Sequence, residues 1–242
     1  MDYAVIAKNL SKSYSGREIL KNCSIKVEKG IIYGLLGHNG AGKTTLFKLL
    51  LGLTRPTAGE ASVLGFDIIS DRKEILKHTG SLIETPVFFE NLSAYENLSI
   101  HLSYMGLEDK NIDSILEVCG LFKTRTQPVS SFSLGMRQRL AIARAIVHKP
   151  QLLILDEPVN GLDSQGIYEM RELFSLLTKR YGMTILLSSH ILSEIEHTAD
   201  KIGILNDGKI IKEESLENIL KIYPGGVEEF YMSILKGGYL YE

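Results

Sequence analysis

The chain has 242 residues, of which 44% are hydrophobic and 23% are charged, a composition typical of a globular protein. Its formal net charge of −2 excludes a general electrostatic attraction to nucleic acid or to an anionic membrane surface. No apolar run reaches the roughly 18–20 residues of a membrane-spanning helix, and the start around Asp2 does not resemble a secretory signal. We therefore expect no direct membrane span, no nucleic-acid partner, and reduced thiols at Cys23 and Cys119.

The first half of the chain begins with β structure and continues into helices. Residues 4–30 contain short strands interrupted by polar residues, which indicates a small antiparallel sheet. The apolar run at 31–37 is typical of a buried strand, and a helix is predicted over 43–53. Its apolar face is formed by Leu46, Leu49, Leu50 and Leu53. Residues 91–149 show helical patterns without a strong strand signal.

The second half returns to alternating strands and helices. Apolar runs at 152–156 and 184–189 predict further buried strands, each followed by a helical pattern. Residues 215–242 read as a short helix, a break at 224–226, a second helix and a Gly-Gly tail. The sequence therefore predicts an α/β fold with a mostly parallel sheet, an N-terminal antiparallel β subdomain and an inserted α-helical subdomain.

The stretch GHNGAGKTT fits the phosphate-binding pattern G-x-x-x-x-G-K-[ST] in its proper context, between a predicted strand and a predicted helix. Glycines let backbone N–H groups approach phosphate oxygens, and a helix N-terminus favours negative charge. Lys43 is expected to reach the β- and γ-phosphates, Thr44 to bind Mg²⁺, and Thr45 to lie near the α-phosphate. The residues expected to bind ATP are Gly37, His38, Asn39, Gly40, Ala41, Gly42, Lys43, Thr44 and Thr45.

Two carboxylates end the predicted strand in LLILDEP, and a serine opens the helix in SFSLGMRQRLAIARA. We expect Asp156 to bind Mg²⁺, either directly or through one of its water ligands, and Glu157 to polarise the attacking water. Ser133 is suited to cap the following helix, whose first turns carry Arg137 and Arg139. Either motif alone is common in proteins, but both occur here beside a phosphate-binding loop.

These motifs, in this order, resemble the nucleotide-binding subunit of an ABC (ATP-binding cassette) transporter. Tyr14 is similar to the aromatic residue that stacks on adenine, and the stretch FSLGM, with Ser133 and Gly135, is similar to the family signature LSGGQ. NGLD at 160–163 resembles the D-loop, and His190 the histidine that senses the γ-phosphate. Leu134 and Met136 depart from the signature, so the ribose-side contact of its glutamine is in doubt, whereas ATP binding is expected to survive.

The resemblance implies a P-loop NTPase (RecA-like) core and a head-to-tail homodimer. Each ATP, with Mg²⁺, would lie between the phosphate-binding loop of one chain and Ser133 and Gly135 of the other. It also implies an ATP-binding domain at 1–222, with its helical subdomain at about 86–146, and a C-terminal helical tail at 223–242. The chain would sit in the cytoplasm, on the inner face of the cell membrane, through transmembrane permease subunits.

Glu84, in the stretch GSLIETPVFF, occupies the place where the family has a glutamine that touches Mg²⁺ and the lytic water. A carboxylate can also bind Mg²⁺, so Glu84 is a candidate catalytic and metal-binding residue. The alternative is a solvated loop residue. The glutamate and its SLIETPVFFENLSAYENL context resemble the ATPase subunits of lantibiotic-immunity and bacitracin-resistance exporters.

Other interpretations remain at this point. The substrate could be another drug or a lipid, or the chain could be a soluble ABC ATPase acting on ribosomes or DNA. A non-hydrolytic regulatory module is a third class, which Glu157 and His190 argue against. Phe88, Phe89 and Tyr95 either line a groove that receives a permease helix or are ordinary packing residues.

Overall fold

The computed structural model describes residues 2–108 and 111–235 of the chain. Its centre is a six-stranded sheet in the order β10-β9-β3-β8-β7-β6. Strands β3 (Ile32–Leu36), β6 (Thr79–Leu82), β7 (Leu152–Leu155), β8 (Thr184–Ser189) and β9 (Lys201–Asn206) run parallel. Strand β10 (Lys209–Ser215) pairs antiparallel with β9. The predicted parallel core is therefore confirmed.

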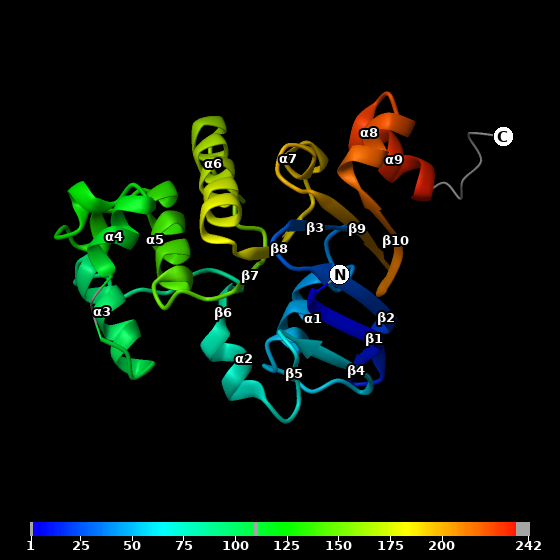
Figure 1. The fold of residues 1–242 in the computed structure, drawn as a ribbon, viewed down its shortest axis with the longest axis horizontal. Helices are drawn as coiled ribbons and strands as arrows, with labels where there is room; N and C mark the ends of the chain where they lie inside the picture. The colour runs from blue at the N-terminus through cyan, green and yellow to red at the C-terminus, as the bar shows by residue number, and fades with distance from the viewer. Residues whose placement is uncertain (1, 109–110, 236–242) are drawn as a thin grey trace.

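A second, four-stranded antiparallel sheet forms the N-terminal part, in the order β2-β1-β4-β5 (Figure 1). Strands β1 (Tyr3–Tyr14) and β2 (Arg17–Glu28) are long rather than short, and their polar interruptions appear as shifts in register. Asn9 and Asn22 take left-handed conformations with φ of 50° and 52°. Polar residues therefore kink these strands without ending them. Strands β4 (Ala58–Val63) and β5 (Phe66–Asp67) complete the sheet and were not predicted.

Helices α3 (Ala94–Tyr104), α4 (Ile112–Val118) and α5 (Leu134–Ile146) gather on one side of the molecule (Figure 1). Short 3₁₀ turns at Phe122–Thr124 and Val129–Ser131 connect α4 to α5. Helix α3 starts with a capping box, in which the Ser93 hydroxyl accepts from the backbone of Glu96 and the Glu96 side chain accepts from the backbone of Ser93. The helical region predicted from the sequence is thus present, and its exact boundaries as a subdomain stay a prediction.

The remaining helices are α1 (Lys43–Leu50), α2 (Arg72–His78), α6 (Ser164–Tyr181), α7 (Leu192–Glu196), α8 (Leu216–Ile222) and α9 (Gly226–Leu235). Helix α1 is shorter than predicted, because the chain turns at Gly52 with φ of 65°. Leu53 therefore lies outside the helix and is 45% exposed. Helices α8 and α9 confirm the expected C-terminal pair, whereas the predicted Gly-Gly tail lies outside the described residues.

The central sheet separates two hydrophobic clusters. Alternate residues of β3 point to opposite faces, so Ile32 and Leu36 join one cluster and Tyr33 and Leu35 the other. The first cluster includes residues of α3 to α9, and the second joins α1 to the antiparallel sheet. This packing fixes the carboxyl ends of the parallel strands, where the candidate site lies.

Candidate active site

The candidate site lies where β3, β7 and β8 end. Gly37 follows β3, Asp156 follows β7, and His190 follows β8. Neighbouring parallel strands bring their carboxyl ends to one edge of a sheet, and ligands of open α/β sheets bind there. The register Leu155↔Leu187 places Asp156 beside Ser188. Three segments that are far apart in the sequence are therefore brought together by strand pairing alone.

The loop between β3 and α1 has a backbone that requires glycine. Gly40 and Gly42 have φ of 84° and 111°, and a Cβ on Gly37 would come within 2.5 Å of the Leu205 carbonyl oxygen. Gly42 caps α1 without a side-chain hydrogen bond. The first-turn N–H groups of an α-helix lack intrahelical acceptors, so this end of α1 is suited to bind an anion.

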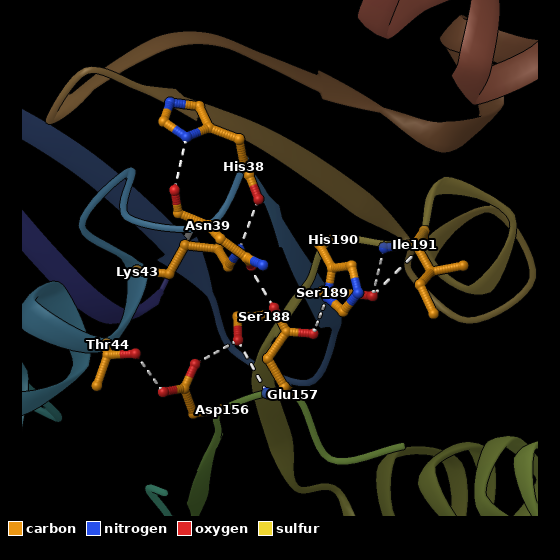
Figure 2. Close-up of polar contacts among 11 residues, drawn as sticks. His38, Asn39, Lys43, Thr44, Asp156, Glu157, Ser188, Ser189, His190 and Ile191 are labelled. Carbon is orange, nitrogen blue, oxygen red and sulfur yellow. Dashed lines mark hydrogen bonds and ion pairs between the residues drawn. The ribbon is translucent and has the colours of Figure 1, made fainter. Parts of the chain in front are cut away.

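Lys43 directs its ammonium group into the site and is only 6% exposed. Its Nζ donates to the Gly37 carbonyl at 2.5 Å and lies 3.2 Å from Glu157 Oε1 (Figure 2). A buried ammonium needs such partners, because burying an unpaired charge is costly. The glycine loop and Glu157 therefore hold the cation at the start of α1, where phosphates of a nucleotide would bind.

Thr44 and Asp156 form the candidate Mg²⁺ site. The Thr44 hydroxyl donates to Asp156 Oδ2 at 2.5 Å, and the Ser188 hydroxyl donates to Asp156 Oδ1 at 2.6 Å. Across the described residues, no group of three or more His, Cys, Asp or Glu forms a cation cage. This donor set fits Mg²⁺, which takes hydroxyl and carboxylate oxygens and usually completes its coordination with phosphates and water.

Glu157 and His190 form a polar pair beside this site. His190 Nδ1 lies 2.7 Å from Glu157 Oε2, while the backbone N–H of Glu157 donates to Ser188 Oγ at 3.0 Å (Figure 2). Glu157 has φ of 49°, a left-handed conformation that is uncommon outside glycine. Its carboxylate thus has both oxygens fixed, one toward Lys43 and one toward His190.

A buried carboxyl group lies behind this pair. Glu194 of α7 is 6% exposed, and burial raises its pKa, whereas the positive charge of Arg171 lowers it. Glu194 and Arg171 line a small apolar pocket together with Ser188 and Ser189. The pocket places a weakly acidic group under the loop that carries His190.

A cavity of about 420 Å³ opens over the phosphate-binding loop. Tyr14 borders it, is 45% exposed, and has the Lys12 ammonium 4.7 Å from its ring centroid. An exposed aromatic ring at the cavity mouth suits stacking on a nucleobase. The other predicted residues on the cavity wall are His38, Asn39, Gly40, Gly42, Lys43, Thr44, Thr45, Asp156 and Glu157. Gly37 and Ala41 belong to the same loop but do not border this cavity.

Glu84 lies beside the cavity rather than in its wall. It follows β6 by two residues, and its Oε1 lies 2.5 Å from the Lys48 ammonium. A neighbouring cavity of about 380 Å³ is bordered by Glu84 and also by Asp156 and Glu157. The structure therefore places Glu84 near the Mg²⁺ candidates, although its carboxylate points to Lys48 in this conformation.

Ser133 and Gly135 lie at a different place. They border a separate cavity of about 460 Å³, between the start of α5 and the segment at 161–169. Ser133 caps α5, since its Oγ accepts from the Met136 N–H at 3.3 Å. A single chain therefore does not bring these two residues to the phosphate-binding loop.

Helix α5 is nevertheless connected to the segment that follows β7. The buried Gln138 amide donates to the Pro158 carbonyl at 2.7 Å, and Pro158 directly follows Glu157. A buried hydrogen bond of this kind is expensive to break without a replacement partner. This hydrogen bond thus connects α5, which carries the FSLGM turn, to the residue next to Glu157.

Comparison with known proteins assigns the family. The sequence profile described as "ABC transporter" matches residues 20–160, which is more than half of the chain. The chain belongs to the ABC transporter family. It is an ATP-binding and ATP-hydrolysing subunit of such a transporter, and ATP-binding subunits of this family work with membrane permeases. Among the described residues, no helix combines the length and hydropathy needed to span a membrane.

Three curated ABC proteins illustrate the similarity. The uncharacterized ABC transporter ATP-binding protein YcbN of Bacillus subtilis is 51% identical over 90% of this chain and 72% of its own length. The bacitracin transport ATP-binding protein BcrA of Bacillus licheniformis is 47% identical over 91% and 72%, respectively. The lantibiotic transport ATP-binding protein SrtF of Streptococcus pyogenes is 46% identical over 87% and 90%.

Solved ABC structures share the fold. The cbiO1 subunit of the cbiONQ transporter from Clostridium perfringens superposes with a TM-score of 0.85 at 27% identity, covering 99% of both chains. The expected P-loop NTPase architecture, with its parallel and antiparallel sheets and helices, is therefore confirmed.

Sequence reasoning missed two residues of this ABC site. Ser188 bonds both Asp156 and the Glu157 backbone, and its signal was its position at the end of the strand next to β7. Lys48 pairs with Glu84, and its signal was a spacing of four residues from Thr44, which puts both on one helical face. Neither residue belongs to a sequence motif, so the contacts of Ser188 and Lys48 become apparent only from the arrangement of the strands in space.

Proposed function

We propose that this ABC ATPase powers a separate membrane permease that exports antimicrobial peptides of the bacitracin or lantibiotic class. The similarity to BcrA and SrtF, at 46–47% identity over most of the chain, carries the proposal. Glu84 and its surrounding sequence, which resemble those of resistance exporters, support it from the residues. The chain would act at the cytoplasmic face of the membrane, held there by its permease.

The residues divide the work of ATP hydrolysis. Lys43, the first-turn amides of α1 and the glycine loop bind the phosphates, and Tyr14 stacks on the adenine. Thr44 and Asp156 hold Mg²⁺, which neutralises phosphate charge when bound. Glu157 orients and polarises the attacking water, and His190, at 2.7 Å, holds the Glu157 carboxylate and senses the γ-phosphate.

A head-to-tail homodimer would complete each site. Ser133 and Gly135 border a cavity separate from the phosphate-binding loop, so a second chain must supply them to the nucleotide. The Ser133 hydroxyl and the first-turn amides of α5 are suitable donors to a γ-phosphate. The separation of these two half-sites within one chain supports the dimer.

The permease would dock on the segment between β6 and α3. Phe88 is 8% exposed and packs under the Arg144 guanidinium, 4.8 Å from its ring centroid. Phe89 is 53% exposed and Val87 is 80% exposed. Phe88 therefore serves as a packing residue, and Phe89 with Val87 offers the apolar contact for a permease helix. We expect that the Phe89→Ala variant no longer co-purifies with the permease, while its circular dichroism spectrum shows an unchanged fold.

The peptide assignment has a direct test. The gene for this chain is expressed together with its neighbouring permease genes in a peptide-sensitive Gram-positive host. The inhibitory concentrations of bacitracin and several lantibiotics are then measured. Protection that is lost in Glu157→Gln supports an ATP-driven resistance exporter. No protection despite assembly and ATPase activity refutes the peptide assignment and directs the search to other drugs or lipids. ATPase activity stimulated by nucleic acid, without a permease, would instead favour a soluble ABC ATPase.

A further inference from the structure

Glu84 is placed at the catalytic edge of the sheet by strand pairing. The Asp156 N–H donates to the Leu82 carbonyl at 2.7 Å, which extends the pairing of β6 with β7 to their carboxyl ends. Glu84 stands two residues beyond Leu82 in a left-handed conformation, with φ of 64°. Such a conformation in a non-glycine residue costs free energy and persists only where neighbouring contacts favour it.

Lys48 supplies such a contact. It lies four residues after Thr44 on α1, so both side chains share one face of the helix. Its Nζ is 2.5 Å from Glu84 Oε1, and the Lys48 side chain is only 34% exposed. On the same face, one turn earlier, Thr44 donates to Asp156. Thr44 and Lys48 thus engage the two carboxylates that follow β7 and β6.

We propose that Lys48 is the positioning residue of Glu84, which it holds beside the Thr44–Asp156 site until nucleotide and Mg²⁺ compete for the carboxylate. This inference rests on the proposed role of Glu84 at the ATP site. A neutral amide at position 84 would need no counter-ion, whereas a glutamate adds a full negative charge near Asp156 and Glu157. Lys48 neutralises this charge. The free energy needed to break the Lys48–Glu84 ion pair then determines how readily Glu84 can bind the metal.

Lys48 should alter the dependence of nucleotide binding on Mg²⁺. Without Lys48, the Glu84 carboxylate has lost its competing cation, so less Mg²⁺ is needed to support nucleotide binding. The same uncompensated charge repels the nucleotide phosphates when no Mg²⁺ is present. A partly exposed ion pair carries about two- to fivefold in an equilibrium constant, which is the size of effect expected.

The test is a double-mutant cycle in binding rather than in turnover. Wild type, Lys48→Met, Glu84→Gln and the double variant are titrated with a fluorescent non-hydrolysable ATP analogue at a series of Mg²⁺ concentrations. Methionine preserves helix propensity and the length of the side chain. Lys48→Met is expected to lower the half-saturating Mg²⁺ concentration about two- to fivefold and to weaken Mg²⁺-free binding. In the Glu84→Gln background, the same substitution is expected to have no effect on either quantity.

Lys221→Met is the matched control, because it removes an ion pair of 2.5 Å to Glu217 on α8. It should leave the Mg²⁺ dependence unchanged. An equal response to Lys48→Met in both backgrounds would show that Lys48 acts on the nucleotide directly, and no response in either would show that the pair has no role; both results overturn the proposal. The assay contains no peptide or permease, so it is independent of the exporter assignment, whereas failure of the parent chain to bind the analogue would refute the site itself.

Discussion

Glu157 and His190 face each other across the ends of β7 and β8, with 2.7 Å between Glu157 Oε2 and His190 Nδ1. The other carboxylate oxygen, Oε1, lies 3.2 Å from the Lys43 ammonium. One side chain thus connects the ammonium group of Lys43 to the histidine after β8. Both carboxylate oxygens of Glu157 are therefore held by basic side chains.

Glu157→Gln should therefore lower the ATPase rate by about 100-fold or more, the range of a lost general base, while ATP binding persists. The glutamine retains the shape and one hydrogen-bonding oxygen. Steady-state phosphate release and equilibrium ATP binding check the two halves of this expectation. Glu217→Gln, on the distant helix α8, is the control and should hydrolyse ATP like the parent. An unchanged rate in Glu157→Gln would show that the base is a different residue.

Ser188→Ala should affect both stability and catalysis. The substitution removes the donor to Asp156 Oδ1 and the acceptor of the Glu157 N–H, which are 2.6 and 3.0 Å from the hydroxyl. Leaving these partly buried groups without partners should reduce the free energy of unfolding by about 1 kcal/mol. We also expect kcat to fall more than KM for ATP rises. Ser189→Ala, whose hydroxyl bonds Ile191 instead, should leave kcat nearly intact.

Phe230→Ala tests whether α9 is part of the main hydrophobic core. Phe230 is 1% exposed and meets Tyr223 edge to face, with 5.4 Å between ring centroids. Removing a buried phenyl ring should cost about 3–5 kcal/mol in the free energy of unfolding, measured by urea denaturation. Met232→Ala, on the same helix and 42% exposed, is the control and should cost much less. If Phe230→Ala reduced the free energy of unfolding as little as Met232→Ala, α9 would contribute little to the core.

The stability of the fold should decrease in mild acid because of His101. Burial, with smaller contributions from the charges of His148 and Arg144, lowers the pKa of His101 from 6.5 to about 4. The unfolded chain then binds more protons than the folded chain between these values. The free energy of unfolding is therefore unaffected by His101 above about pH 6.5. Titration of His101 lowers it as the pH falls toward 4, by at most about 3 kcal/mol.

Unfolding free energies measured from pH 7 to pH 4.5 check this dependence. His101→Leu should flatten the profile, because it removes the titrating ring from the buried site. His197→Gln, at an exposed histidine, should leave the profile unchanged. If His101→Leu has the same slope as the parent, another group governs the acid response; His148, whose pKa burial also lowers, is then the next candidate.

The motifs predicted most of the site because they are local. A glycine loop followed by Lys43 and Thr44, and a buried strand followed by Asp156 and Glu157, each specify a backbone geometry over a few residues. Strand order then assembles them, and the apolar runs were sufficient to predict a parallel sheet. Lys48 and Ser188 were missed because their partners are set by tertiary contacts rather than by sequence neighbours.

The antiparallel sheet shows a different limit. Polar residues in 4–30 suggested short strands, yet β1 and β2 each span twelve residues. Asn9 and Asn22 break the register but not the strands, since Asn tolerates a left-handed conformation. Likewise, the end of α1 is set by the turn at Gly52 rather than by its leucine pattern, which continues to Leu53.

The hydrogen bond from Gln138 to the Pro158 carbonyl couples the movement of α5 to that of the segment after β7. It joins α5 to the residue that follows Glu157, so a rotation of the helix that keeps this bond must also displace that strand end. A displacement of the helical layer by an outside partner would therefore also move Glu157, the candidate base. In the same way, a movement of that strand end on nucleotide binding would be passed to α5. The two movements stay coupled for as long as this one amide contact is kept.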